Sequence, residues 1–294
     1  MKKYKIITEG VNKGRIQALR SFKDIKEGNI GGFIDSENNL SHEGTCWVYA
    51  FAKVRENAKV SEDAKVHGSV EISGNAIISG NANVFENAKI FEEARVSENA
   101  WVCGDASVYG SASVYGSSSV FGKAKVFGDV KVYENAKVHG RAKVHGYANV
   151  YGRAYISENA NVHGNVQVYG NAYVFGNAQV YGDAEIFGNA EVYGRSEVYG
   201  GATVFGCAKI FGEAEVYENA IIYDNAKVYG NTVVFENARV GGYAKVVDHA
   251  NVYGNALLCE DALLCDYVAV YGDALICGND KISGEVKLHN RRFK

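Results

Sequence analysis

Two pairs of residues with reactive side chains show the same separation along this chain. His145 and His163 form one pair, and Cys259 and Cys277, equally far apart, form the other. Imidazole nitrogen and thiolate sulfur are ligands that zinc and softer metals prefer, but a zinc site needs three or four of them. Each pair therefore supplies only part of a metal site, and both pairs are weak candidates.

Two other histidines are candidates for a general base. His249 and His42 lie outside the regular positions that the remaining histidines occupy. A histidine changes its charge near neutral pH and can accept a proton from a reacting group. Ordinary surface histidines are the competing interpretation for both residues. Whether either histidine can act as a base depends on the strands and corners that position it.

Most of the chain consists of a six-residue repeat. From Val48 to Leu288 every sixth residue is Val, Ile or Leu, which makes 41 positions, and a residue four places later is alanine at 31 of 40 positions. Side chains alternate across a strand, so the aliphatic and the small residue share one face. The Gly-Asn or Glu-Asn pairs that follow the strands favour turns. Each unit is therefore predicted to be a short strand followed by a corner.

These units predict an all-β fold, a single-stranded parallel β-helix with three sides and about 18 residues per coil, because three units close one coil. Forty-one units make about 13 to 14 coils. Proline is absent from all 294 residues, as expected for a chain whose backbone is hydrogen-bonded almost throughout. Residues 1–47 are expected to form a small N-terminal β cap, residues 48–288 the β-helix, and residues 289–294 a basic tail that covers the last open edge.

The repeat resembles that of left-handed β-helix hexapeptide-repeat proteins, and the left-handed sense of coiling follows from this resemblance. Residues 28–49, GNIGGFIDSENNLSHEGTCWVY, resemble the leader of uncharacterised bacterial and prophage hexapeptide-repeat proteins, some of them labelled acyltransferases. The resemblance implies an acyl-CoA-dependent acyltransferase, a trimer with a histidine on or near a protruding loop. The uninterrupted repeat from Val48 to Leu288 contains no such loop. A related family of trimeric carbonic anhydrases binds zinc through histidines, which brings His145 and His163 into consideration.

Outward aromatic residues recur at 18-residue spacing on more than one face and are expected to stack in ladders along the β-helix. Such stacking stabilises neighbouring strands by about 0.2 to 1 kcal/mol per pair. A platform for sugars, bases or a partner protein is the alternative interpretation. The tyrosines that would bind such a ligand lie in two ladders, one with Tyr115, Tyr133, Tyr151 and Tyr169 and the other with Tyr181, Tyr199 and Tyr217.

Outward positions become apolar close to the C-terminus. Leu257, Cys259, Leu275 and Cys277 are predicted to share one face, and they form a contiguous apolar surface. Patches of this kind mark interfaces. We therefore expect the chain to form a homo-oligomer through these residues. Packing of the patch under the C-terminal tail is the alternative.

Composition and charge narrow the class of protein. The net charge is −3, and a basic band over residues 119–155 precedes an acidic band over residues 156–222. The basic band is too short for an extended nucleic-acid groove, so nucleic acid is not expected as a partner. There is no apolar run that suggests a signal peptide or a membrane span. Six cysteines without a CxxC pair do not suggest a disulfide framework, so a reduced, cytoplasmic protein is expected.

These features favour a non-enzymatic, rigid β-helical rod that acts as a structural or protein-interaction module. It is expected to self-associate, to be encoded by a phage or prophage, and to need no cofactor. One alternative is the hexapeptide-type acyltransferase, with His249 or His42 as the base. The other is a phage-borne inhibitor that binds a host protein.

Overall fold

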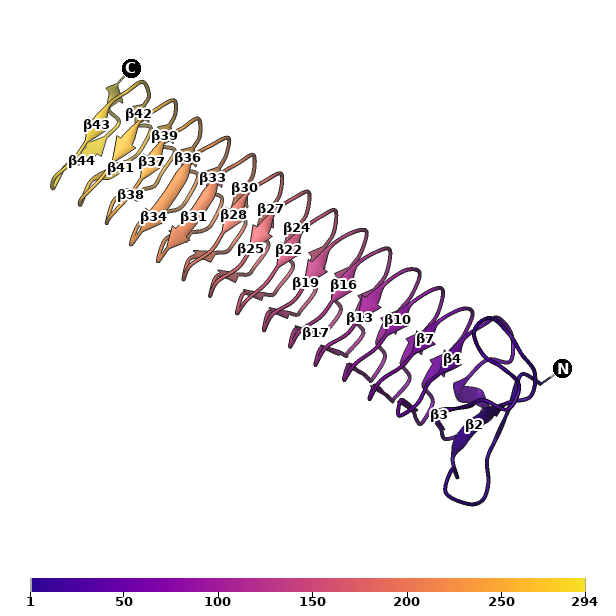
Figure 1. Cartoon of the computed structure of the whole chain (residues 1–294). Coiled ribbons are helices and arrows are strands. Elements are labelled where there is room, and N and C mark those ends of the chain that lie inside the picture. Colours follow the sequence, from indigo (N-terminus) through magenta and orange to yellow (C-terminus); the bar gives the residue numbers. More distant parts are fainter. Residues whose placement is uncertain (1, 294) are drawn as a thin grey trace. The chain divides into compact units, whose positions relative to one another are not determined.

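The computed structural model describes residues 2–293. Met1 and Lys294, the outermost residues of the predicted cap and tail, lie outside this range. The chain divides into two compact units, residues 1–146 and 147–294, and each unit is described by itself. In both units short parallel strands wind into three-sided coils, and Figure 1 shows the strands of each unit stacked one above another.

Three sheets run along the first unit and are named here face 1, face 2 and face 3, in the order in which the chain visits them. Face 1 contains β4 (Trp47–Val48), β7 (Lys65–Val66), β10 (Asn83–Val84), β13 (Trp101–Val102), β16 (Ser119–Val120) and β19 (Lys137–Val138). Face 2 contains β5 (Lys53–Val54), β8 (Glu71–Ile72), β11 (Lys89–Ile90), β14 (Ser107–Val108), β17 (Lys125–Val126) and β20 (Lys143–Val144). Face 3 contains β6 (Lys59–Val60), β9 (Ile77–Ile78), β12 (Arg95–Val96), β15 (Ser113–Val114) and β18 (Lys131–Val132).

The second unit repeats this arrangement. Its face 1 contains β22 (Tyr155–Ile156), β25 (Tyr173–Val174), β28 (Glu191–Val192), β31 (Lys209–Gly212), β34 (Lys227–Gly230), β37 (Lys245–Val246), β40 (Leu263–Leu264) and β43 (Lys281–Ile282). Face 2 contains β23 (Asn161–Val162), β26 (Gln179–Val180), β29 (Glu197–Val198), β32 (Glu215–Val216), β35 (Val233–Val234), β38 (Asn251–Val252), β41 (Ala269–Tyr271) and β44 (Lys287–His289). Face 3 contains β21 (Asn149–Val150), β24 (Gln167–Val168), β27 (Glu185–Ile186), β30 (Thr203–Val204), β33 (Ile221–Ile222), β36 (Arg239–Val240), β39 (Leu257–Leu258), β42 (Leu275–Ile276) and β45 (Arg292–Phe293).

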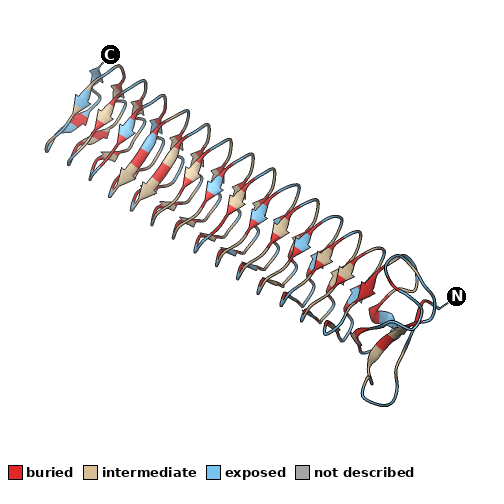
Figure 2. Ribbon diagram, viewed as in Figure 1, coloured by how far each residue is buried: buried red, intermediate tan, exposed pale blue. Residues whose placement is uncertain are grey.

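Residues one coil apart lie side by side within each unit. Val114 pairs with Val132 in the first unit, and Ile210 pairs with Val228 in the second. Most inward aliphatic and small residues, such as Val174 and Ala178, have no exposed surface, whereas Ile282 and Val286 near the C-terminus are partly exposed. Figure 2 shows buried and more exposed residues alternating along the coils. The predicted all-β parallel solenoid with its 18-residue spacing is confirmed, and three strands per coil make about 14 coils. The left-handed sense of coiling stays a prediction.

The corners between strands require a left-handed backbone conformation. Glycine supplies it at many corners, as at Gly188 with φ +72°, and most of the other residues with positive φ are glutamate or aspartate. Several of these acidic residues accept a hydrogen bond from the next coil, and Glu92 Oε2 lies 2.8 Å from the backbone nitrogen of Gly110. This bond offsets part of the strain that a side chain meets at positive φ.

A small antiparallel sheet covers the start of the first unit, as the sequence predicts. Strands β1 (Tyr4–Ile6) and β2 (Arg15–Ala18) pair antiparallel, and β2 pairs with β3 (Ile30–Ile34) in the same sense. Strand β3 then runs parallel to β5 and joins the cap to face 2. Gly32 makes this approach possible, because a Cβ there would lie 2.5 Å from the carbonyl oxygen of Ala52, the residue before β5.

The basic C-terminal tail extends the sheets of the second unit. Strand β44 pairs with β41, and β45 pairs with β42 so that Arg292 lies beside Leu275. The tail therefore lies beside Leu275 within face 3, as one more strand of the sheet.

Candidate functional site

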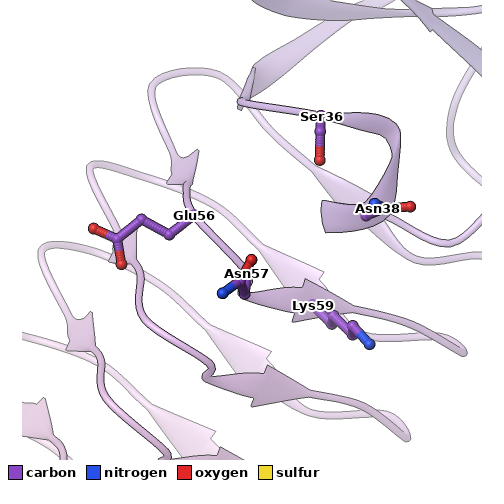
Figure 3. Close-up of a pocket in the computed structure, with 5 residues that line it drawn as sticks. All are labelled: Ser36, Asn38, Glu56, Asn57 and Lys59. Carbon is purple, nitrogen blue, oxygen red and sulfur yellow. The ribbon is translucent and has the colours of Figure 1, made fainter.

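A polar groove lies between the N-terminal cap and the first coils of the first unit. Its volume is about 570 Å³, and it is lined by Ser36, Asn38, Glu56, Asn57 and Lys59. In Figure 3, Ser36 and Asn38 project from the cap segment, whereas the carboxylate of Glu56 and the ammonium of Lys59 point away from each other. The groove is thus lined by polar groups from two separate parts of the chain.

The buried residue Asn39 holds the two sides of this groove together. It ends the 3-10 helix η1 (Glu37–Asn39), and its Nδ2 donates hydrogen bonds to the carbonyl oxygens of Glu56 at 2.9 Å and Ala58 at 2.8 Å. Its Oδ1 accepts a bond from the backbone nitrogen of Ser36 at 2.8 Å. A buried amide with all these partners fixes the cap on the coil.

A second groove of about 440 Å³ lies on the other side of Glu56 and includes Phe33, Asp35, Lys53 and Arg55. Asp35 Oδ2 accepts a hydrogen bond from the Glu56 backbone nitrogen at 2.9 Å, and Lys53 lies 3.5 Å from Glu71. The two grooves can hold small polar ligands. Neither groove has a histidine or a cysteine among its lining residues.

His42 takes part in the packing of the cap. Its ring stacks on Tyr4 with centroids 4.4 Å apart, and Nδ1 accepts a hydrogen bond from the Lys3 backbone nitrogen at 3.2 Å. Its Nε2 is buried and lies 3.7 Å from a carboxylate oxygen of Glu37. These contacts place His42 in a structural cluster, and its role as a base remains a prediction.

A buried lysine lies next to this cluster and was not singled out by the sequence. Lys3 has no exposed surface, and its Nζ donates to the carbonyl oxygen of Cys46 at 3.0 Å and to Cys46 Sγ at 3.2 Å. Burial raises the pKa of the Cys46 thiol. The pair holds the start of the chain against the strand that begins the repeat.

His249 lies on an exposed corner of the second unit. It stacks on Tyr267 with ring centroids 4.7 Å apart, and its Nε2 lies 3.4 Å from Asn231 Nδ2. The residue is exposed despite these two contacts. Its role as a general base remains a prediction.

The two histidines considered for metal binding lie in different units. His145 stacks on Phe127 at 4.7 Å in the first unit, and His163 stacks on Tyr181 at 5.2 Å in the second. Burial lowers the pKa of His163, so burial favours its neutral ring. Within residues 2–293 a different set, Asp248, Cys265 and Asp266, brings three potential ligand atoms together, but it is a partly exposed acidic cluster.

Cys259 and Cys277 form a disulfide, with Cα atoms 4.7 Å apart. The prediction that the cysteines stay reduced is therefore wrong for this pair. Residues one coil apart lie opposite each other in a parallel ladder, which brings their Cα atoms into the range that a disulfide spans. Because a disulfide offers no thiolate, the pair does not form the soft-metal site considered above. Leu257 and Leu275 pair beside it in register, both partly exposed.

The tyrosines of the predicted ladders stack face to face within each unit. Tyr115 and Tyr133 lie 5.0 Å apart in the first unit. In the second unit Tyr151 stacks on Tyr169 at 4.8 Å, and Tyr181, Tyr199 and Tyr217 stack at 4.7 Å steps. Burial, together with a hydrogen bond to Glu197, raises the pKa of Tyr181 to about 12. Each ring covers its neighbour's face, so the ladders stabilise the coils and offer mainly ring edges to a ligand.

The groove beside the cap was missed because its lining residues belong to no motif. One signal points to it, since the repeat changes phase by two residues between Cys46 and Val48. The phase change marks where the cap meets the coils, but it does not show which side chains line the groove.

The fold and the repeat define the class of this chain as a hexapeptide-repeat-like β-solenoid. A family model, the YdcK β-solenoid repeat, matches residues 166–182. This segment holds β24, β25 and β26, which together make one coil, and the chain is similar to that repeat over this stretch. No curated protein matches the chain.

Proposed function

We propose that the chain is a non-enzymatic structural or protein-interaction module that associates with copies of itself. The observation that carries this proposal is the apolar surface on face 3 of the second unit. Leu257 and Leu275 lie next to each other there, and the Cys259–Cys277 disulfide lies alongside. Arg239 and Arg292 lie on either side of the two leucines along face 3 and bound this surface. Contiguous apolar side chains in outward positions favour an interface.

The stacked coils suit such a role. Each inward side chain packs against its counterparts in the coils on either side, and the outward residues lie at fixed spacings of about 4.8 Å. Within residues 2–293, no helix has the length and apolarity that crossing a membrane requires. A rigid scaffold of this kind presents a surface at little cost in conformational entropy.

Replacing both Leu257 and Leu275 with lysine is expected to convert the oligomer into a monomer. Like charges on adjacent strands repel, and a lysine is costly to bury in an apolar interface. Sedimentation velocity measures the outcome, and the matched control is Glu185→Lys with Thr203→Lys, which occupy equivalent positions on face 3. The control should leave the sedimentation mass unchanged. An oligomer that survives the leucine exchange would contradict the proposal.

The same experiment separates the alternative in which the chain is a phage-borne inhibitor of a host protein. Such an inhibitor would use an exposed apolar patch for a different partner. The purified chain would then sediment as a monomer before any exchange of Leu257 or Leu275.

The acyltransferase alternative makes a different prediction. A site for an acyl-CoA should give a saturable heat signal in calorimetry with acetyl-CoA, and His249→Ala or His42→Ala should weaken it. We expect no saturable binding at micromolar concentrations, because His42 is engaged with Tyr4 and Lys3 and His249 is stacked on an exposed corner. Micromolar binding that depends on either histidine would favour the enzyme.

We propose the cytoplasm as the location of this module. Four cysteines in the described residues carry free thiols, which is typical of a reducing compartment. The Cys259–Cys277 disulfide is unusual for that compartment, and its position beside Leu257 and Leu275 places it within the proposed interface.

A further inference from the structure

Trp101 departs from the way in which the aromatic side chains of the first unit are arranged. Most rings on neighbouring coils lie face to face, as Tyr109 and Phe127 do at 4.8 Å, and Tyr49 and His67 are an exception. Trp101 has Asn83 and Ser119 as its neighbours along face 1, and its nearest ring, Phe85, meets it edge-on at 78°. As a result 52% of the Trp101 surface is exposed. A flat apolar surface of this size is left without a stacked ring.

A hollow of about 330 Å³ lies beside the indole of Trp101 and is lined by Asn99, Ser117 and Ser119. This volume is at the lower end of the range for small-molecule sites. Asn99 Oδ1 accepts a hydrogen bond from Asn81 at 3.3 Å. Its amide nitrogen and the two serine hydroxyls make no hydrogen bond within residues 2–293, so these groups can bind a ligand.

The outward strand residues beside the hollow are uncharged over three coils. Along face 1, Asn83, Trp101 and Ser119 separate Lys65 from Lys137, and the adjoining corners carry Asn81, Asn99 and Ser117. The carboxylate of Glu98, the nearest acidic group on the preceding corner, lies 3.1 Å from the Gly116 backbone nitrogen. An uncharged ligand that carries many hydroxyl groups matches this surface.

We propose that Trp101 is the platform of a binding site for a neutral oligosaccharide. The flat face of a pyranose ring with equatorial hydroxyls carries several C–H groups and packs on the indole, while Asn99, Ser117 and Ser119 bind its hydroxyls at the rim. Successive coils are about 4.8 Å apart, which is close to the length of one sugar unit in an extended chain. Neighbouring units of the oligosaccharide can therefore reach the amide nitrogen of Asn83, whose Oδ1 lies 3.0 Å from His67 Nε2.

Stacked nucleobases are the competing ligand for an exposed indole, and the charges disfavour them. Binding of single strands combines aromatic stacking with a positively charged groove along the backbone. The lysines nearest to Trp101 on face 1 are two coils away on either side, Lys65 and Lys137. The site therefore lacks the cations that phosphate groups need.

Intrinsic fluorescence provides the test, because the chain has only two tryptophans. Trp47 is 1% exposed, so a ligand-induced change in emission reports on Trp101. Cellotetraose and chitotetraose are the probes, and we expect at least one of them to give a saturable blue shift. Trp101→Ala should weaken binding at least about tenfold, which corresponds to about 1.4 kcal/mol. Binding to that variant is measured by calorimetry.

Three further variants separate the site from a general effect on folding. Trp101→Tyr keeps a stacking face and should retain part of the affinity, whereas Ser119→Val should weaken binding several-fold by removing a hydroxyl. Phe51→Ala removes an aromatic side chain that is 68% exposed elsewhere on the first unit and should change nothing. The proposal is wrong if neither sugar binds the unaltered chain, if Trp101→Ala binds as well as the unaltered chain, or if oligothymidylate binds more tightly than both sugars.

Discussion

Replacing Val228 with aspartate is expected to destabilise the second unit strongly. Val228 has no exposed surface and lies between Ile210 and Val246 in the interior of face 1. A carboxylate at this position has no partner and loses its hydration, at a cost of about 4 kcal/mol or more. Coils are stabilised by their neighbours, so the damage extends to both sides. Thermal unfolding monitored by circular dichroism should show a loss of roughly 10 °C or more.

The adjacent residue on the same strand supplies the matched control. Lys227 is exposed and lies between Lys209 and Lys245 in the outward ladder. Lys227→Asp introduces the same side chain on the outer surface and relieves repulsion between like charges. Its melting temperature should match that of the unaltered chain or slightly exceed it. Equal stability of Lys227→Asp and Val228→Asp would contradict the assignment of inward and outward positions.

A second large loss is expected when Gly188 is replaced with valine. The backbone of Gly188 has φ +72°, and a Cβ there would lie 2.9 Å from the backbone nitrogen of Gly206 in the next coil. A β-branched residue in this conformation is strained, and the next coil must shift to make room. Together these effects cost about 3 kcal/mol or more, which chemical denaturation of the chain can measure.

The opposite exchange at an equivalent corner tests the cause of this loss. Glu218 also has positive φ, at +58°, and its carboxylate makes no hydrogen bond within residues 2–293. Glu218→Gly removes the strain of a side chain at positive φ but increases the freedom of the unfolded chain. These terms nearly cancel, so the free energy of unfolding should change by less than about 1 kcal/mol. A large decrease in the free energy of unfolding of Glu218→Gly would show that the glutamate side chain stabilises the corner.

The solenoid could be predicted because each repeat unit in the sequence corresponds to one strand and one corner of the fold. An aliphatic residue at every sixth position from Val48 to Leu288 specifies the inward side of every strand. The period of one coil also identifies the neighbours of each outward residue, including Leu257 beside Leu275 and Tyr181 beside Tyr199. These relations follow from the backbone alone and need no knowledge of individual side-chain conformations.

The candidate sites were less predictable, because they depend on irregular contacts. Spacing places Cys259 opposite Cys277, but bond formation also depends on the Cβ directions and on oxidation, and the disulfide was not expected. The position of the groove near Ser36 and Lys59 depends on the backbone path of the cap, and the cap has no sequence repeat from which that path could be predicted. Trp101 occupies an ordinary outward position, and only the smaller residues beside it, Asn83 and Ser119, leave its ring exposed.

The in-register stacking of residues one coil apart makes length an adjustable property of the second unit. Removing residues 183–200 would join Gly182 to Gly201, and the flanking strands β26 and β30 would keep their inward and outward sides. Gain or loss of a gene segment that encodes one coil would therefore change the unit in steps of about 4.8 Å without altering its cross-section. The number of coils therefore sets the length of the unit.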